Sequence, residues 1–87
     1  MTMKQITVDC AAIQNPRQMH KALAEALHFP QWYGSNLDAL HDCLTGLSED
    51  TCLTLQRFSA MGPFSAGFRR VLQDSENENP HLQIFFK

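Results

Sequence analysis

Three short segments of this chain have the character of strands, and longer segments with helical spacing separate them. Residues 3–8 and 51–56 have apolar side chains at alternate positions, and residues 82–86 form a short apolar run that contains two aromatic residues. The connections over residues 9–50 and 57–81 are too long for hairpins, and they favour parallel pairing with right-handed crossovers. The sequence therefore predicts an α/β fold in which a three-stranded parallel sheet is packed by helices mainly on one face.

Helical spacing and end signals predict three helices between these strands. Asn15 followed by Pro16 is a helix cap with proline at the first helical position, so a helix begins there, and it should stop before Pro30. A second helix is expected from about residue 37 to residue 45. A third begins near Pro63 and fades through the polar run that precedes the last strand.

The size and charge of the chain limit what it can bind. Its 87 residues, 44% of them hydrophobic, suffice for one core, so we expect a single domain over residues 1–87. The net charge is −2, and acidic side chains gather in two stretches without lysine or arginine, residues 38–50 and 74–78. Such a surface repels nucleic acid and attracts a basic protein, so we expect no direct nucleic acid binding.

The sequence has no signal for export or for membrane insertion. The first residues lack the apolar core of a signal peptide, and no apolar run approaches the roughly 20 residues that span a membrane. We therefore expect a cytoplasmic protein with no membrane partner. Cys10, Cys43 and Cys52 are odd in number and widely spaced, which predicts reduced, buried thiols rather than a disulfide framework.

Residues 32–46 have the features of a loop, a capped helix and a helix stop in succession. Gly34 permits a turn, Ser35 or Asn36 can cap the helix, and Gly46 supplies a conformation in which helices often end. A rotation of 100° per residue divides this helix into two faces. The residues expected to face the core are Leu37, Leu40, Cys43, Leu44 and Leu47. The residues expected to face outward are Asp38, Asp42 and Thr45, with His41 at the margin.

The outward face of this helix is acidic and lies beside aromatic residues. Asp38 and Asp42 are one turn apart, and their repulsion costs an isolated helix about 0.2–0.5 kcal/mol. No lysine or arginine occurs over residues 22–56 to neutralise them. One interpretation is a plain solvated helix face. The combination of these carboxylates with Trp32 and Tyr33 favours a second interpretation, a protein-binding surface.

Common catalytic and metal-binding motifs are missing from the sequence. It has no Cys-x-x-Cys, no His-Glu-x-x-His and no Gly-x-Ser-x-Gly. Asp38, His41 and Asp42 could serve as acid and base only in a pocket that excludes water, so a small hydrolase is the less favoured alternative. We expect neither enzyme activity nor a metal or cofactor.

The stretch from Trp32 to Gly46 closely resembles the core motif of the barstar family, the intracellular inhibitors of barnase-like ribonucleases. The matching pattern is Trp32-Tyr33-Gly34-x-Asn36-Leu37-Asp38-Ala39-Leu40-x-Asp42-Cys43-Leu44-Thr45-Gly46. The resemblance implies a barstar-like fold and a basic microbial ribonuclease as partner. It also implies that the chain is a cytoplasmic protein, monomeric when free, whose central helix and preceding loop block the enzyme's active site with carboxylates in place of RNA phosphates.

The resemblance also assigns roles to residues by position. Asp42 would be the central carboxylate, bound to the enzyme's phosphate-binding arginine and catalytic histidine, and Asp38 would meet further basic groups. Trp32 would stack at the active-site entrance, where the family commonly has tyrosine. The full set of implied partner-binding residues is Trp32, Tyr33, Gly34, Asn36, Asp38, His41, Asp42, Thr45, Gly46, Asp74 and Glu78.

Three features depart from the family pattern. His41 stands where barstar has tryptophan, Asp74 is one methylene shorter than the family's glutamate, and the segment between the second strand and the last helix is short enough to lack a helix. These departures leave a second function open: a barstar-fold interaction or regulatory module whose partner is not a nuclease.

Overall fold

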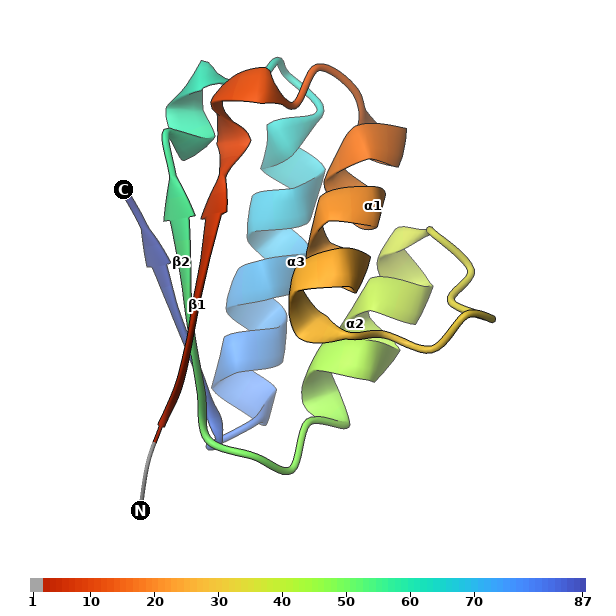
Figure 1. Cartoon of the computed structure of the whole chain (residues 1–87), viewed down its shortest axis with the longest axis vertical. Helices are drawn as coiled ribbons and strands as arrows, with labels where there is room; N and C mark the ends of the chain where they lie inside the picture. Colours follow the sequence, from red (N-terminus) through yellow and green to blue (C-terminus); the bar gives the residue numbers. More distant parts are fainter. Residues whose placement is uncertain (1–2) are drawn as a thin grey trace.

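The computed structural model describes residues 3–87 and contains one sheet and one layer of helices (Figure 1). The elements in chain order are β1 (Lys4–Asp9), η1 (Cys10–Ala12), α1 (Pro16–Leu27), α2 (Leu37–Thr45), β2 (Thr51–Gln56), η2 (Phe58–Ala60), α3 (Ser65–Glu78) and β3 (Leu82–Phe86), where η denotes a short 3-10 helix. The three α-helices lie on the same side of the sheet (Figure 1). The predicted α/β architecture is therefore confirmed.

The sheet has the strand order β1-β2-β3, and both strand pairs are parallel. Ile6 lies opposite Leu53, and Leu53 lies opposite Ile84, so that apolar side chains align across the sheet. Leu53 and Ile84 belong to the buried hydrophobic core, and the partly buried Ile6 packs against it. The long connections between the strands thus led to the correct pairing, because a parallel neighbour can be reached only by a crossover.

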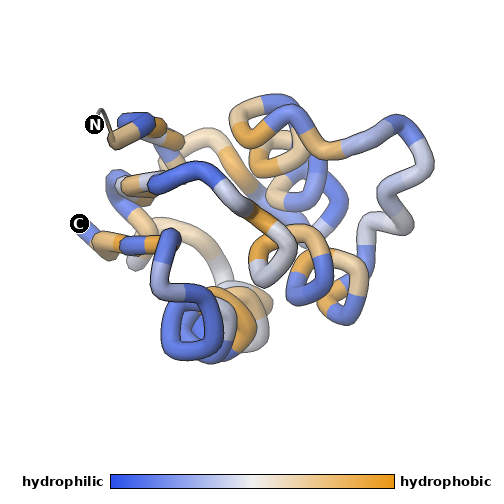
Figure 2. The backbone as a smooth tube through the Cα atoms, turned by 90° about the horizontal axis from the view of Figure 1, so that it is seen from below, coloured by the Kyte–Doolittle hydropathy of each residue, from blue (hydrophilic) through white to orange (hydrophobic). Residues whose placement is uncertain are grey.

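The hydrophobic core fills the space between the sheet and the helices. Each α-helix alternates hydrophobic and hydrophilic residues along its length (Figure 2), as expected when one face is buried. The fully buried side chains include Met19, Leu23, Leu40, Leu44, Leu53, Leu55 and Leu72. Burial of one such leucine contributes about 1.5–3 kcal/mol. Leu40 and Leu44 therefore fix α2 against the rest of the domain.

The element boundaries differ slightly from those predicted. The first strand occupies Lys4–Asp9 rather than residues 3–8, and the last helix begins at Ser65 rather than near Pro63. Residues 63–64 form a turn instead, which the N–H of Ser65 closes by donating to the carbonyl of Gly62 at 3.0 Å. Differences of one or two residues are common at helix ends, where hydrogen bonding changes gradually. Between β2 and α3 there is only the 3-10 helix η2, in agreement with the short segment.

The cysteines are all free thiols. Cys10 and Cys52 are buried, as predicted, whereas Cys43 on α2 is only partly buried. Burial raises the pKa of Cys10 and of Cys43, which keeps these thiols protonated. Within residues 3–87, no helix is long and apolar enough to cross a membrane.

Candidate protein-binding site

The loop of residues 28–36 joins α1 to α2 and projects from the helix layer (Figure 1). Its two ends are formed by residues with positive φ, His28 at 57° and Ser35 at 52°. Gly34, which the sequence analysis expected to make the turn, does not have a positive φ. Its lack of a side chain matters instead, because a Cβ at Gly34 would come within 3.0 Å of the Asn36 side-chain amide.

A partly buried hydrogen bond attaches this loop to α1. The ring Nδ1 of His20 lies 2.6 Å from the hydroxyl of Tyr33. The Tyr33 ring also packs on Phe29, and the His20 ring packs on Phe68, with centroid distances of 5.0 and 4.8 Å. Burial raises the pKa of Tyr33 to about 12 and lowers the pKa of His20, so both groups are neutral near pH 7. Tyr33 is thus an anchor of the loop.

The neighbouring residue, Trp32, points the other way. Its side chain is 81% exposed, in contrast to the buried hydrophobic residues of the core. Between this part of the loop and α2 lies an open groove of about 420 Å³. The groove is lined by Leu27, His28, Phe29, Pro30, Trp32, Tyr33, Ala39, Asp42, Cys43, Gly46 and Leu47. An apolar hollow with a carboxylate beside it can receive a side chain that is both flat and cationic.

Helix α2 begins and ends where the sequence predicted. The side chain of Asn36 caps it, since its Oδ1 accepts a hydrogen bond from the N–H of Ala39 at 2.8 Å. At the other end, Gly46 follows the last helical residue with φ −85°, outside the left-handed region in which glycine often ends helices. A Cβ at Gly46 would approach the carbonyl oxygen of Asp42 to 3.2 Å. Glycine is therefore favoured at position 46 because it has no side chain that would crowd this carbonyl oxygen.

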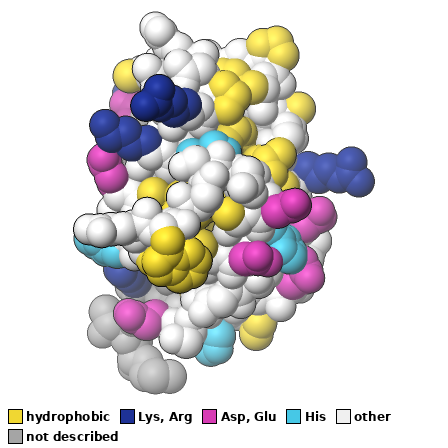
Figure 3. Space-filling view, turned by 90° about the vertical axis from the view of Figure 1, so that its right-hand side faces the viewer, with side chains coloured by type: hydrophobic (Ala, Val, Ile, Leu, Met, Phe, Trp, Pro, Cys, Tyr) yellow, Lys and Arg dark blue, Asp and Glu magenta, His cyan; other side chains and the backbone are white. Residues whose placement is uncertain are grey.

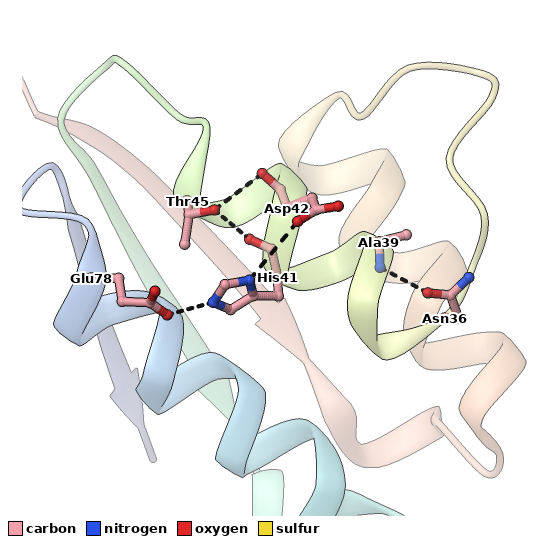
Figure 4. Close-up of polar contacts among 6 residues, drawn as sticks. All are labelled: Asn36, Ala39, His41, Asp42, Thr45 and Glu78. Carbon is pink, nitrogen blue, oxygen red and sulfur yellow. Dashed lines mark hydrogen bonds and ion pairs between the residues drawn. The ribbon is translucent and has the colours of Figure 1, made fainter.

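The outward face of α2 carries the predicted acidic residues. Asp38 and Asp42 are both exposed, and the side chain of Asp42 is 87% exposed. The hydroxyl of Thr45, a partly buried residue on the same helix, donates to the carbonyl of His41 at 2.8 Å (Figure 4). Both carboxylates are therefore accessible to a partner.

His41 connects the acidic residues of α2 with those of α3. Its Nε2 makes a short hydrogen-bonded ion pair with Glu78, and its Nδ1 lies 4.0 Å from Asp42 (Figure 4). The hydrogen bond to Glu78 raises the pKa of His41, and the negative charges of Asp42 and Asp74 act in the same direction. Figure 3 shows acidic side chains grouped around a histidine on this side of the molecule, next to exposed hydrophobic side chains. We refer to Asp38, His41, Asp42, Asp74 and Glu78 as the acidic face.

A buried asparagine holds the C-terminal end of α2 in position, and the sequence analysis missed it. Asn79, 4% exposed, donates from its side-chain amide to the carbonyls of Leu44 at 2.9 Å and Leu47 at 3.0 Å. Its side-chain oxygen accepts from the N–H of His81 at 2.9 Å. The only signal in the sequence was its place before Pro80 at the end of a helix, which is typical of an ordinary helix end.

The acidic face is suited to binding more than to acid–base chemistry. The carboxylates of Asp38 and Asp42 stand in solvent, and His41 is 35% exposed, so water surrounds the groups that a hydrolase would use. In the part of the chain that the structure describes, no three histidine, cysteine or acidic side chains gather as metal ligands. What the arrangement offers is a set of anions beside an exposed tryptophan and an apolar groove.

Comparisons with known proteins agree with the fold and the motif. Residues 3–86 match the family model described as Barstar (barnase inhibitor). The chain is also 35% identical over 81 residues to a protein of Bacillus subtilis (strain 168) named "Putative ribonuclease inhibitor YrdF", and the match covers 87% of this chain and 89% of that protein. A family match over nearly the whole described chain, with this sheet and helix order, leads to one conclusion: the chain belongs to the barstar family.

Proposed function

We propose that this protein inhibits a barnase-like microbial ribonuclease by placing α2 and the loop of residues 28–36 in the enzyme's active site. Family membership and the name of the Bacillus subtilis relative support an inhibitor of ribonucleases. The observation that carries the proposal is the exposure of Asp42 beside the apolar groove and Trp32. A ribonuclease already positions cations to hold RNA phosphates, so an inhibitor needs only to present anions in a matching arrangement.

The energetics of such a contact favour Asp42 as its centre. A carboxylate and an arginine 4 Å apart attract each other by about 4 kcal/mol at an effective dielectric constant of 20, before the cost of desolvation is subtracted. Among residues 3–87, the ion-pair contact of Asp42 is with His41 at 4.0 Å, and its side chain is 87% exposed, so its charge is available to a partner. Asp38 lies one helical turn away and would meet further basic groups, while Trp32 would stack at the entrance of the active site.

The remaining residues of the site have supporting roles in this proposal. Asn36, Thr45 and Gly46 lie at the two ends of α2, where they would contact the enzyme along the loop and the helix end. Asp74 and Glu78 extend the negative charge onto α3. The summed charge would also steer a basic enzyme toward this face, an effect for which barnase and barstar are themselves the established example.

We propose further that the inhibitor is a monomer when free and acts in the cytoplasm, in the manner of an antitoxin. The free thiols of Cys10 and Cys52, both buried, are in keeping with a reducing compartment.

The test is inhibition of purified ribonucleases by the wild-type protein and two variants. The enzymes are barnase, other guanyl-preferring microbial ribonucleases, and the nucleases that the host secretes. Truncating one partner of a desolvated charge pair costs about 2–5 kcal/mol, a range to which barnase and barstar themselves contribute. Asp42→Ala should therefore weaken inhibition by about 30-fold or more. Its melting temperature should stay the same or rise slightly, because repulsion with Asp38 is relieved.

Glu49→Ala is the matched control, since Glu49 is an exposed carboxylate outside the acidic face. It should change inhibition by less than about threefold, the effect of an exposed charge at the rim. If the two variants weaken inhibition equally, the assigned site is wrong. If no ribonuclease of the panel responds to micromolar protein, the inhibitor proposal fails, and a barstar-fold module for another basic protein takes its place.

A further inference from the structure

Protonated His41 forms an ion pair with Glu78 on the acidic face, and a cation of a binding partner can take its place there. The four carboxylates of the face, Asp38, Asp42, Asp74 and Glu78, belong to two helices that pack against each other. His41 is the side chain that bridges them, with Glu78 at one ring nitrogen and Asp42 near the other. Its environment is therefore acidic from both α2 and α3.

His41 competes with a partner's cations for the Glu78 carboxylate, because it already pairs with it. The side chain of Glu78 is 57% exposed, so a partner can reach the carboxylate that His41 holds. An arginine can form two parallel hydrogen bonds with a carboxylate, whereas one ring nitrogen of histidine forms a single bond. An incoming arginine can thus replace His41 at Glu78.

We infer that His41 is a specificity-determining residue of this face: its protonated ring occupies the place of a partner cation beside Glu78, and a basic partner must expel that proton to bind there. This inference concerns the same site as the proposed function and rests on it for the identity of the partner. The exchange is balanced, since the partner's cation takes the ion pair with Glu78 and the proton on His41 passes to the solvent.

The exchange makes binding depend on pH in a defined direction. A cation placed next to protonated His41 repels it, so the pKa of His41 is lower in the complex than in the free protein. Binding therefore releases up to one proton, and affinity rises with pH by up to tenfold per unit between the two pKa values. The groups that face His41 are Asp42 on α2 with Asp74 and Glu78 on α3, and all three are carboxyl groups.

The number and spacing of a partner's cations therefore decide how many protons are released when it binds the acidic face. A partner whose cations meet only Asp42 leaves the pair of His41 and Glu78 intact, so it should release fewer protons than a partner that also binds Glu78. A partner with a further arginine for Glu78 binds with proton release and gains from alkaline conditions. The face therefore favours an enzyme with two separated basic groups over one with a single cation.

The first measurement is an NMR titration of the ring signals of the four histidines in the free protein between pH 5 and pH 9. The variants are Glu78→Gln and Asp50→Asn, because His81 pairs with Asp50 at 2.8 Å in a similar exposed contact outside the acidic face. Glu78→Gln should lower the titration midpoint of His41 by about 0.5–1 pH unit and leave His81 unchanged. Asp50→Asn should leave the His41 midpoint unchanged. An unchanged His41 midpoint in Glu78→Gln would overturn the inference.

The second measurement uses hexaarginine as a chemical probe, so that it does not depend on any ribonuclease. At low ionic strength and at the pH of the His41 midpoint, saturating hexaarginine should release protons from the wild-type protein, as measured by pH-stat titration. His81→Gln is the matched control and should release as many protons from the acidic face, whereas His41→Gln should release clearly fewer. Equal release by the two variants would overturn the inference.

The two proposals can fail separately. If a ribonuclease is inhibited but hexaarginine releases no proton through His41, the inhibitor function stands and the exchange does not. If hexaarginine releases the proton and no ribonuclease is inhibited, the exchange stands and the partner is another arginine-rich protein.

Discussion

Replacing Asn79 by alanine removes the polar contacts that hold the C-terminal end of α2. The Asn79 side chain is buried and donates to the carbonyls of Leu44 and Leu47. The Leu44 carbonyl lies in the last turn of α2 and also accepts from the N–H of Leu47 at 3.4 Å, while the Leu47 carbonyl lies just past the helix. Alanine fits the space but supplies neither donor nor acceptor, so both carbonyls lose the Asn79 amide and the N–H of His81 loses its acceptor.

The expected loss of stability follows from those contacts. The Asn79 side chain makes three hydrogen bonds, two to these carbonyls and one from the N–H of His81, and each contributes about 0.5–1.5 kcal/mol. We expect Asn79→Ala to lower the free energy of unfolding by about 2–4 kcal/mol. A domain of 87 residues has a total of about 4–13 kcal/mol, so this is a large fraction.

Urea denaturation monitored by circular dichroism measures this loss. With an m-value of about 1–1.5 kcal/mol/M, the midpoint should fall by about 2 M. Asn77→Ala is the matched control, because Asn77 lies on the same helix and is exposed. It should change stability by less than about 0.5 kcal/mol. If Asn79→Ala lies within that margin of the control, the buried hydrogen bonds do not hold α2 as argued.

Asn79→Asp tests whether the Asn79 side chain is the donor in these hydrogen bonds. An ionised carboxylate cannot donate to the carbonyls of Leu44 and Leu47, and it is repelled by them, so this variant should be less stable than Asn79→Ala near pH 7. A protonated carboxyl can donate one hydrogen bond. The stability deficit relative to wild type should therefore shrink as the pH falls through the pKa of the new carboxyl group. A deficit that is constant with pH would refute this assignment of donor and acceptor.

Two further predictions concern the loop and the acid stability of the domain. Tyr33→Phe keeps the ring packing but removes the hydrogen bond to His20, so it should lower the free energy of unfolding by about 1 kcal/mol and loosen the loop. Because Trp32 is the one tryptophan, its fluorescence anisotropy should fall in this variant, and an unchanged anisotropy would contradict the prediction. The contact with Arg57 lowers the pKa of Asp9 from 3.8 to about 2. Asp9 therefore stabilises the fold above pH 4, and this contribution disappears between about pH 4 and pH 2. In urea denaturation at several pH values, the difference between wild type and Asp9→Asn should vanish over that range, whereas a constant difference would count against the assignment.

Local patterns were sufficient for the architecture and for the acidic helix. The alternation in residues 51–56 and the helical spacing after Asn36 are each properties of a few neighbouring residues, since strand and helix periods follow from backbone geometry. Cap signals at Asn15 and Asn36 worked for the same reason, and both side chains accept the predicted backbone hydrogen bond. The exposure of Asp38 and Asp42 followed from the position of the leucines on the opposite side of the helix.

The contacts between elements could not be predicted in this way. His41 and Glu78 are 37 residues apart, and Asn79 and Leu44 are 35 residues apart. Their meeting depends on the angle at which α2 packs on α3, which many buried side chains decide together. The roles of Gly34 and Gly46 were also misjudged, because close approach by neighbouring atoms, and not a positive φ, is what requires glycine there.

The sequence alone determined a parallel α/β domain of the barstar family with an acidic, aromatic-edged helix, because repeating local geometry and a contiguous motif carry that information. The tertiary structure decided which polar groups form hydrogen bonds and ion pairs within the protein and which remain available to a partner. It buries Asn79 under α2, turns Tyr33 inward to His20, pairs Glu78 with His41, and leaves Asp42 in solvent. The physical reason is that hydrogen bonds and ion pairs form between groups brought together by packing of the core, and sequence separation does not encode those distances.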